Sequence, residues 1–311
     1  MDRPSIIETV GLAKRFDEVV AIRDLSFSIE HGEIFGLVGP DGAGKTTTMR
    51  MLAGILAPDS GSIKVAGCDV IKDPDGVKSR ISYMPQRFGL YEDLTVDENI
   101  RFYADLFGVA RKARIERAAR LLAACTMSQF RDRLAGNLSG GMKQKLSLVC
   151  ALIHTPQVLL LDEPTNGVDP ISRREFWAML YSLLDQGVTI LTTTAYLDEA
   201  ERCHRLALLH EGHLLFCDSP HNLKEQLPGG VISIVAPDPR GLRRKLSHAP
   251  GVTGTVLVGD AVHVFVDDPA ARLPRIRERL DSEGLAYTEI AHVAPTIEDL
   301  FVNATSSTEA A

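Results

Sequence analysis

The sequence predicts an α/β protein with a mostly parallel sheet, followed by a smaller α+β domain. First, the apolar run 34–38 leads through a Gly-rich turn into a helical pattern over 45–53. Second, apolar runs at 158–161, 189–193 and 206–209 are separated by helical patterns, and such alternation is typical of a parallel sheet. Third, a Pro-Gly-Gly break leads into a second, shorter series of strands and helices. These observations predict two domains.

The first domain is expected to cover residues 1–220. Residues 19–22 and 25–29 are expected to be strands, and the second of them alternates apolar and polar side chains. Residues 97–127 are rich in Ala, Arg, Leu and Glu at helical spacing, which predicts an all-helical insertion. Together with the helical pattern that follows it, this insertion predicts a helical subdomain over about 97–155.

The second domain is expected to cover residues 230–302 and to have a regulatory or dimerisation role. Its pattern predicts strands and helices in the order β-α-β-β-α-β, which is a ferredoxin-like arrangement. The predicted strands are 231–236, 252–258, 261–266 and 285–292, and the predicted helices are 240–248 and 270–283. A short helix over 295–302 and a disordered tail over 303–311 complete the expected chain.

Composition and charge exclude several classes of protein. The chain has 311 residues, 45% hydrophobic and 24% charged, as is usual for a globular protein. A formal net charge of −7 argues against a general nucleic-acid binder, so no nucleic-acid partner is expected. The five cysteines form no C-x-x-C pair, and no apolar stretch approaches the roughly 20 residues that cross a bilayer. The N-terminal residues lack a signal-peptide pattern.

A phosphate-binding loop is the most specific motif in the sequence. It matches G-x-x-x-x-G-K-[ST] and lies between an apolar strand and a helix, the context that such a loop requires. Its backbone N–H groups are expected to face phosphate oxygens, with Lys45 at the terminal phosphates and the Thr46 hydroxyl on Mg²⁺. The predicted binding residues are Gly39, Pro40, Asp41, Gly42, Ala43, Gly44, Lys45, Thr46 and Thr47.

Two carboxylates follow the buried strand 158–161. Asp162 is expected to hold Mg²⁺, and Glu163 is expected to polarise the attacking water as a general base. An apolar run that ends in Asp-Glu is weak evidence by itself, because many strands end in a capped turn. The phosphate loop upstream makes the combination specific for nucleoside triphosphate chemistry.

A third motif, Leu-Ser-Gly-Gly, precedes the helical pattern 145–154. Ser139 is expected to be the N-cap of a helix, while Gly140 and Gly141 leave the N–H groups of the helix start accessible. A capped helix with no further role is the simpler interpretation. The motif lies only about 20 residues before the Asp-Glu pair, a spacing that favours a functional role.

In this order over residues 7–217, the motifs resemble those of the ATP-binding subunits of ABC transporters. The resemblance implies ATP and Mg²⁺ as ligands, hydrolysis of ATP to ADP and phosphate, and a dimer with ATP at the subunit interface. It implies that Phe16 stacks on adenine, that Gln86 senses Mg²⁺ and the membrane partner, and that Asp169 lies in a loop between subunits. Without it, Phe16 would be interpreted as a core aromatic residue and Gln86 as an ordinary surface residue. The catalytic set is then Glu163, Lys45 and Gln86, and the metal set is Thr46, Gln86 and Asp162.

One position departs from the family pattern. The resemblance implies a histidine that contacts the γ-phosphate after the strand 189–193, and alignment of the segment places Ala195 there. A methyl group cannot donate a hydrogen bond to a phosphate oxygen. One hypothesis is that the chain binds MgATP but hydrolyses it slowly, in partnership with a more active ATPase. The alternative is that Glu163 suffices and turnover is ordinary.

The resemblance also indicates the kind of machine. Segment 294–301 resembles the end of ATPases that serve ABC-2-type permeases, and several motifs resemble the first cassette of a tandem-fused multidrug efflux ATPase. Apolar residues beside Gln86, including Phe88 and Tyr91, would form the groove for a helix of the membrane subunit, or simply pack in the core. The expected partners are ABC-2-type permease subunits and a second ABC ATPase subunit, which is a copy of this chain or a paralogue. The expected location is the cytoplasm, peripherally attached to the membrane.

Two alternative functions remain open from the sequence. The chain could be a regulatory cassette that binds ATP and pairs with an active ATPase, which the Ala195 position supports. It could also be a soluble ABC ATPase without a permease, although it lacks the second cassette and the long coiled coils that such proteins usually carry.

Overall fold

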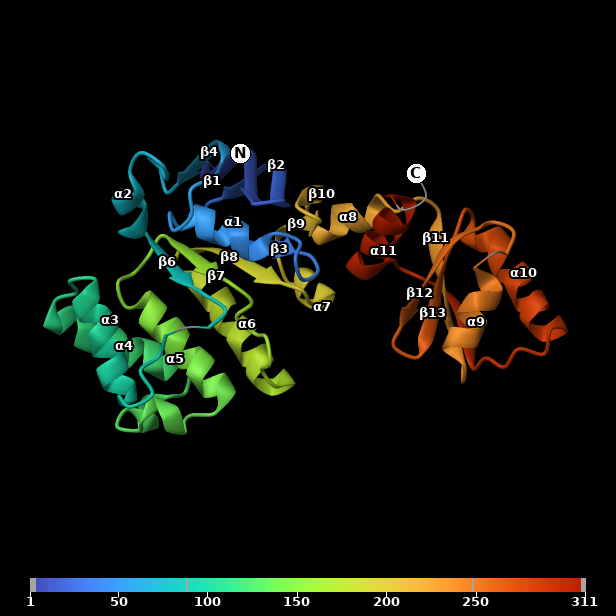
Figure 1. Cartoon of the computed structure of the whole chain (residues 1–311). Helices are drawn as coiled ribbons and strands as arrows, with labels where there is room; N and C mark the ends of the chain where they lie inside the picture. Colours follow the sequence, from blue (N-terminus) through green and yellow to red (C-terminus); the bar gives the residue numbers. More distant parts are fainter. Residues whose placement is uncertain (1–3, 88, 248, 309–311) are drawn as a thin grey trace. The chain divides into compact units, whose positions relative to one another are not determined.

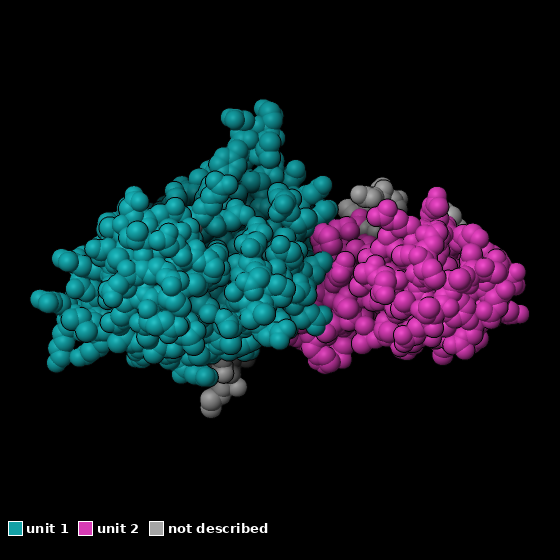
Figure 2. Space-filling model, turned by 90° about the horizontal axis from the view of Figure 1, so that it is seen from below, with its two compact units in different colours: residues 1–217 teal, residues 218–311 magenta. Residues whose placement is uncertain are grey.

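The computed structural model describes residues 4–87, 89–247 and 249–308. It divides into two compact units, Met1–Cys217 and Asp218–Ala311 (Figure 2). The boundary therefore lies earlier than the predicted 220 and 230, because α8 (Pro220–Glu225) packs against the last helix of the second unit. Phe88, which the sequence placed beside the permease groove, lies outside the described residues.

The first unit contains two sheets (Figure 1). The smaller has the order β2-β1-β4-β5, in which β1 pairs antiparallel with β2 and β4. The larger has the order β10-β9-β3-β8-β7-β6, and its pairings from β9 to β6 are parallel. The smaller sheet comprises β1 (Ser5–Phe16), β2 (Val19–Glu30), β4 (Ser60–Val65) and β5 (Cys68–Asp69). The larger comprises β3 (Ile34–Val38), β6 (Ile81–Met84), β7 (Val158–Leu161), β8 (Thr189–Thr194), β9 (Arg205–His210) and β10 (His213–Asp218).

The predicted α/β fold with a mostly parallel sheet is confirmed, with one correction near the N-terminus. The sequence predicted separate strands at 19–22 and 25–29, but the structure joins them in β2. Asp24, in the middle of this strand, has a φ of 47°. This local irregularity explains why the alternation of apolar and polar side chains is interrupted. β1 was not predicted, because its side chains alternate between buried and exposed only over part of its length.

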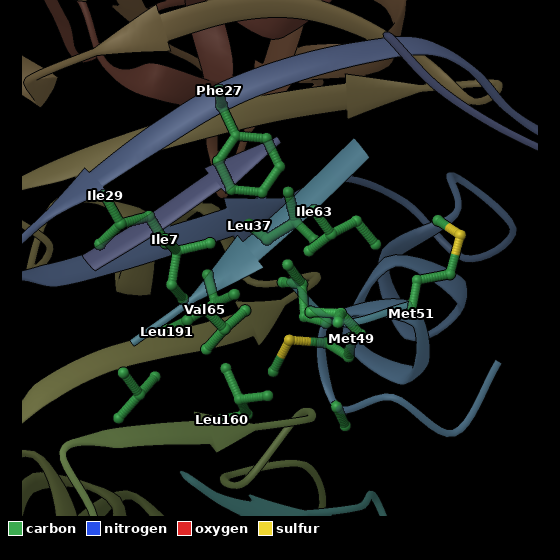
Figure 3. Packing of buried hydrophobic residues seen from close by; sticks show 14 of the residues in the cluster. Ile7, Phe27, Ile29, Leu37, Met49, Met51, Ile63, Val65, Leu160 and Leu191 are labelled. Carbon is green, nitrogen blue, oxygen red and sulfur yellow. The ribbon is translucent and has the colours of Figure 1, made fainter. Parts of the chain in front are cut away.

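The core of the first unit lies on both faces of the six-stranded sheet. On one face, α1 (Lys45–Leu52) and the antiparallel sheet enclose a cluster that includes Ile7, Leu37, Met49 and Leu160 (Figure 3). On the other face, α5 (Gly140–Leu152) and α6 (Pro170–Leu184) pack their apolar side chains against β7 and β8. Burial of each large apolar side chain contributes about 1.5–3 kcal/mol. This packing holds the ends of β3, β7 and β8 in place.

Helices make up the region between β6 and β7. Here α3 (Val96–Leu106), α4 (Arg111–Ala124) and α5 share a cluster of buried side chains. Thr95 begins α3 with a reciprocal capping box, in which Glu98 accepts from the Thr95 backbone and Thr95 accepts from the Glu98 N–H. Shorter helices in this unit are α2 (Pro74–Lys78) and α7 (Leu197–Ala200). Within the described residues, no helix combines the length and the apolar character needed to span a membrane.

The second unit is a four-stranded sheet with the order β12-β13-β11-β14, and its described pairings are antiparallel. The strands are β11 (Gly230–Val235), β12 (Val252–Val258), β13 (Ala261–Val266) and β14 (Glu289–Val293). Helices α9 (Pro239–Leu246) and α10 (Pro269–Ser282) contribute to one buried cluster with these strands. The element order is the β-α-β-β-α-β order expected from the sequence.

The end of the chain differs from the prediction. The sequence predicted a short helix to residue 302 and a disordered tail over 303–311, but α11 extends over Ile297–Thr308. Asp299 stabilises the start of this helix by accepting hydrogen bonds from the backbone and hydroxyl of Thr296. Ile297 and Leu300 are buried, so the helix has an apolar side that the polar tail pattern did not indicate.

Candidate functional site

The phosphate loop, the Asp-Glu pair and Ala195 lie at the carboxyl ends of three adjacent strands, β3, β7 and β8. The phosphate-loop sequence follows β3, and the Asp-Glu pair follows β7. In an open parallel sheet, loops that follow the strands meet at this edge, which is where ligands usually bind. The fold therefore brings together two motifs that are more than 100 residues apart in the sequence.

The phosphate loop turns sharply into α1. Gly44 has a φ of 101°, and a Cβ atom there would lie 2.6 Å from the Ala21 carbonyl oxygen, so only glycine fits. Lys45 follows as the first residue of α1 and is 4% exposed. Its Nζ donates to the carbonyl oxygens of Gly39 and Pro40 at 2.8 and 3.0 Å. The lysine thus spans its own loop and holds a positive charge inside it.

Asp162 is buried and surrounded by hydroxyl groups. Its Oδ1 accepts from Thr46 Oγ1 at 3.1 Å and from Thr193 Oγ1 at 2.8 Å, and its Oδ2 accepts from the Tyr83 hydroxyl at 3.2 Å. Burial, with a further contribution from the Asp162 charge, raises the pKa of Tyr83 to about 12, so its hydroxyl keeps its proton at neutral pH. A direct hydrogen bond thereby joins Thr46 and Asp162, two of the three residues that the sequence assigned to Mg²⁺, whereas Gln86, the third, contacts Glu163.

Glu163 contacts three polar side chains. Its Oε1 lies 3.2 Å from Lys45 Nζ, and its Oε2 accepts from Gln86 Nε2 at 2.9 Å and from Asn166 Nδ2 at 3.3 Å. Its backbone has a φ of 48°, in the left-handed region that non-glycine residues rarely adopt. In the catalytic set predicted from the sequence, Lys45 and Gln86 therefore both contact Glu163.

A cavity of about 260 Å³ opens beside Glu163. Asp41 of the phosphate loop forms one wall, and Ala195 forms another. The remaining lining residues are Thr165, Asn166, Thr194 and Tyr196. The structure thus places the Ala195 methyl group in the same cavity as the proposed base, where it offers no hydrogen bond.

The Leu-Ser-Gly-Gly motif forms a second polar group with the loop before α6. Ser139 is the N-cap of α5, as predicted, and accepts from the Met142 N–H at 3.3 Å. Asp169 caps α6 and accepts from the backbone of Ile171 and Ser172, whose hydrogen bonds lower the pKa of its carboxyl. A Cβ atom on Gly141 would overlap the Ser172 side chain, so the close approach of the two helix starts requires glycine.

The structure describes no contact between the Leu-Ser-Gly-Gly group and the group formed by the phosphate loop and the Asp-Glu pair. Within the described residues, no hydrogen bond or ion pair joins Ser139, Gly140, Gly141 or Asp169 to the phosphate loop. Gly140 has open space where a side chain would be, since a Cβ atom there would meet no atom within 4 Å. In the described part of the chain, the helix start at Ser139 therefore has no hydrogen bond or ion pair to the phosphate loop.

Phe16 is not a core residue, because 46% of its surface is exposed at the end of β1. Lys14 Nζ lies 5.6 Å from the centre of its ring. Gln86 is exposed but has the specific partner described above, so it is more than an ordinary surface residue. The other loop residues occupy the turn before α1 and its first turn, and they range from buried to exposed: Pro40, Asp41, Gly42, Ala43 and Thr47.

Sequence patterns missed three residues that organise the site. Tyr83 and Thr193 contact Asp162, as described above. Glu199, which is 1% exposed, accepts from Thr165 at 2.7 Å, Thr194 at 2.8 Å and Trp177 at 3.3 Å, and thereby links the loop after Glu163 to β8. Tyr83 and Thr193 were detectable in principle, since they lie at the ends of strands that flank β7 in the parallel sheet.

The donor set fits a magnesium nucleotide. A hard cation such as Mg²⁺ prefers one or two protein oxygens together with phosphate oxygens, and Thr46 and Asp162 present such oxygens side by side. Backbone N–H groups at the start of α1 and the Lys45 ammonium suit the phosphate charge. The arrangement can therefore bind a triphosphate and place a carboxylate next to it.

Comparisons with known proteins agree with this chemistry. The sequence family described as "ABC transporter" matches residues 22–166. The "Probable multidrug ABC transporter ATP-binding protein YbhF" of Escherichia coli (strain K12) is 46% identical over 304 residues, which cover 96% of this chain and 52% of that protein. The chain thus spans about half the length of this relative, and the same holds for its counterpart in Shigella flexneri.

Other relatives match over nearly their whole length. The "Nod factor export ATP-binding protein I" of Burkholderia thailandensis is 41% identical over 301 residues, which cover 96% of each chain. Among solved structures, an ATP-binding subunit of an ABC transporter has a TM-score of 0.65 and 28% identity, over 71% of this chain and 93% of that one. Clostridium perfringens cbiO1, at 22% identity and a TM-score of 0.66, covers 89% of this chain and 99% of its own, and supports the fold alone. The chain belongs to the family of ABC transporter ATP-binding proteins.

Proposed function

We propose that this chain binds MgATP and hydrolyses it to ADP and phosphate, and that the reaction powers an exporter of the ABC-2 type. The observation that carries the proposal is the convergence of Lys45, Thr46, Asp162 and Glu163, each within 3.2 Å of another member of the group. This combination provides a cation for the phosphates, oxygens for a metal ion, and a carboxylate for water. The names of the relatives support export as the coupled process.

The proposed reaction is an in-line attack of water on the terminal phosphorus. The new bond joins the water oxygen to phosphorus, and the bond between the terminal phosphorus and the oxygen that leaves with ADP breaks. Glu163 orients the water and accepts its proton, while Lys45 and the loop N–H groups stabilise charge on the phosphate oxygens. Thr46 and Asp162 would hold Mg²⁺, which neutralises phosphate charge when bound.

We further propose that the site is completed by a second ABC ATPase subunit. At the Ser139–Gly141 helix start, Ser139 and Gly140 are exposed and Gly141 is buried, and the structure describes no contact between this helix start and its own phosphate loop. A partner's nucleotide would supply the anion that such a helix start favours. The partner subunit is a copy of this chain or a paralogue, and the permease would hold both at the cytoplasmic face of the membrane.

The experiment that tests hydrolysis uses Glu163→Gln, which removes the carboxylate charge but keeps the shape of the side chain. Turnover is expected to fall by at least about 10²–10³-fold, while binding of a fluorescent ATP analogue persists. Binding and turnover are measured on the same preparation. The variant Thr46→Ala, which removes a proposed Mg²⁺ ligand, is expected to need a higher Mg²⁺ concentration for both. Brisk hydrolysis by Glu163→Gln would remove Glu163 from its proposed role.

A second candidate is a regulatory cassette that binds ATP but turns over slowly. The observation that favours it is the Ala195 methyl group in the cavity beside Glu163. Replacement of Ala195 by histidine adds a donor to that cavity and is expected to raise the rate about tenfold or more if this candidate is correct. An unchanged rate with the Ala195→His variant would instead support ordinary turnover that depends on Glu163. A soluble ABC ATPase without a permease is less well supported, given the export functions named for the relatives.

A further inference from the structure

Thr193 lies between the strand that leads into the phosphate loop and the strand that carries the two carboxylates. β8 pairs with β3 on one side, where Thr193 is opposite Leu37, and with β7 on the other, where Thr192 is opposite Leu161. Thr193 is therefore one residue beyond the last described β7 pair, level with Asp162. Its side chain is completely buried, so its hydroxyl cannot rely on bulk water for hydrogen bonds.

The Thr193 hydroxyl makes two hydrogen bonds of 2.8 Å. Its oxygen accepts from the backbone N–H of Glu163, and the same hydroxyl donates to Asp162 Oδ1. The directions are fixed, because a backbone N–H can only donate and a hydroxyl has one hydrogen to give. One side-chain atom is thus bonded to both of the residues that the proposed reaction needs after β7.

The hydrogen bond from the Glu163 N–H to Thr193 gives this N–H an acceptor beyond the end of β7. β7 ends at Leu161, and the N–H of Asp162 still donates to the Met84 carbonyl oxygen. At Glu163 the backbone turns into the left-handed region, with a φ of 48°. A buried N–H without an acceptor is unfavourable, and so is a left-handed glutamate, so this conformation depends on contacts such as the one with Thr193.

The hydrogen bond from Thr193 to Asp162 restricts the orientation of the Asp162 carboxylate. The Oδ1 atom that accepts from Thr193 also accepts from Thr46 Oγ1, at 3.1 Å. Two donors on one oxygen restrict rotation of the carboxylate, and the Tyr83 hydroxyl, at 3.2 Å, restricts the second oxygen. Thr193 therefore limits the orientations in which Asp162 can face Thr46.

The neighbouring threonines do not share this role. Thr194 has its hydroxyl on Glu199, to which it donates at 2.8 Å, and it accepts from the Tyr196 N–H at 2.9 Å. Successive side chains of a strand point to opposite faces, so Thr192 and Thr194 face away from the side used by Thr193. A run of three threonines suits a buried strand by propensity alone, and only the structure distinguishes the middle one.

We propose that Thr193 is a positioning residue for hydrolysis, whose single hydroxyl holds the Glu163 backbone and the Asp162 carboxylate in the orientations that the reaction requires. The proposal rests on the function proposed above, and it adds a residue that touches neither nucleotide nor water. It predicts that loss of the hydroxyl affects the chemical step and the Mg²⁺ requirement more than the affinity for ATP.

The test compares Thr193→Val, which keeps the shape but removes the hydroxyl, with Thr193→Ser, which keeps the hydroxyl. Thr9→Val is the matched control. Thr9 is also buried, in β1, and its hydroxyl likewise accepts from a backbone N–H, that of Phe27 at 2.9 Å, but donates to a backbone carbonyl, that of Phe27 at 3.1 Å, and not to a carboxylate. It lies outside the proposed site, so it reports the cost of losing such a hydroxyl from a strand.

For Thr193→Val, kcat is expected to fall on the order of 10–100-fold, with the KM for ATP within about threefold of the original. Half-maximal retention of a fluorescent ATP analogue is expected to need about fivefold more Mg²⁺ or higher. Thr193→Ser is expected to restore most of the rate, and Thr9→Val to leave kcat and the Mg²⁺ requirement unchanged. A Thr193→Val protein with the original kcat and Mg²⁺ requirement would overturn the proposal, as would an equal loss in Thr9→Val.

Glu163→Gln, measured in parallel, separates this proposal from the proposed function. Equal brisk hydrolysis by the unmodified chain and Glu163→Gln would remove only Glu163 from its role. If neither protein hydrolyses ATP, the proposed function fails. The Mg²⁺ dependence of nucleotide binding then still tests Thr193 without any turnover. Should Thr193→Val fail to fold, as judged by the fluorescence of the single tryptophan, Thr193→Ala carries the same comparison with less volume in the core.

Discussion

The six-stranded sheet of the first unit and the four-stranded sheet of the second unit use buried polar side chains in different ways. At the carboxyl edge of the six-stranded sheet, Lys45 contacts Glu163, which lines a cavity, and Asp162 contacts Thr46. In the four-stranded sheet of the second unit, the buried pair of His263 and Asp299 is joined at 2.8 Å, and Asp299 also caps its own helix. Both groups satisfy their hydrogen bonds, but only the first borders a cavity that can admit a ligand.

The difference indicates which buried polar groups serve a ligand and which serve the fold. A polar side chain whose partners all come from nearby elements, as with Asp299, can be explained by stability alone. A set of charges that borders a cavity at the end of parallel strands retains the capacity to bind something else. Four variants can test this distinction.

The largest effect is expected from Lys45→Met, which removes the charge inside the phosphate loop. Affinity for a fluorescent ATP analogue is expected to fall on the order of 100-fold, because a buried cation no longer meets the phosphates. Lys145→Met is the matched control, since Lys145 is also buried and ion-paired, with Glu175 at 2.6 Å in the helical region. An equal loss of affinity in Lys145→Met would show that removal of any buried, ion-paired lysine weakens ATP binding, which would contradict a specific role for Lys45.

The next effect is expected from Asp299→Ala in the second unit. Loss of the carboxylate leaves His263 and Thr296 without their acceptor, which costs about 2 kcal/mol of stability. Urea unfolding followed by circular dichroism reports both units, while fluorescence of Trp177 reports the first unit alone. The dichroism transition is expected to shift to lower urea, with nucleotide binding unchanged. A loss of ATP affinity in this variant would contradict a purely structural role for the pair.

A smaller effect concerns a buried histidine in the first unit. His154 stacks on Phe107 with ring centres 3.8 Å apart, and its Nε2 lies 3.0 Å from the Ile81 carbonyl oxygen. Burial lowers the pKa of His154, so the folded chain binds this proton less readily than the unfolded chain, whose histidine titrates near 6.5. The stabilisation is therefore present above pH 6.5 and is lost as the pH falls.

Below this pH, the free energy of unfolding is expected to fall by up to about 1.4 kcal/mol per pH unit from this group. Urea titrations between pH 7.5 and 5.5 on the unmodified chain and on His154→Gln measure the contribution. The variant is expected to show a shallower dependence on pH. The same slope in both proteins would assign the pH dependence to other groups.

The smallest effect is expected from Phe16→Ala. If this exposed ring stacks on adenine, its loss weakens ATP binding by about 1 kcal/mol, or roughly fivefold. Inorganic tripolyphosphate offers the same phosphates without a base, so its affinity is expected to stay unchanged. Equal weakening for both ligands would indicate that Phe16 supports the loop instead of the base.

The linear sequence determined much of this protein by itself. The spacing of the phosphate loop, the apolar run before Asp162 and the Ser139 cap depend on local chemistry, so their patterns are visible within a few residues. The strands of the second unit were predicted within a few residues for the same reason. The disordered tail was predicted wrongly over 303–308, because the polar composition of the tail does not reveal that the helix begun at the buried residues Ile297 and Leu300 continues through it.

Only the tertiary structure decided which side chains meet. Thr193 lies 31 residues after Asp162 in the sequence, and Tyr83 lies 79 residues before it, yet both are within hydrogen-bond distance of its carboxylate. Nothing in the run Thr192, Thr193 and Thr194 marks the middle residue, because strand propensity treats all three alike. Pairing of β8 between β3 and β7, which is a long-range property of the sheet, selects it.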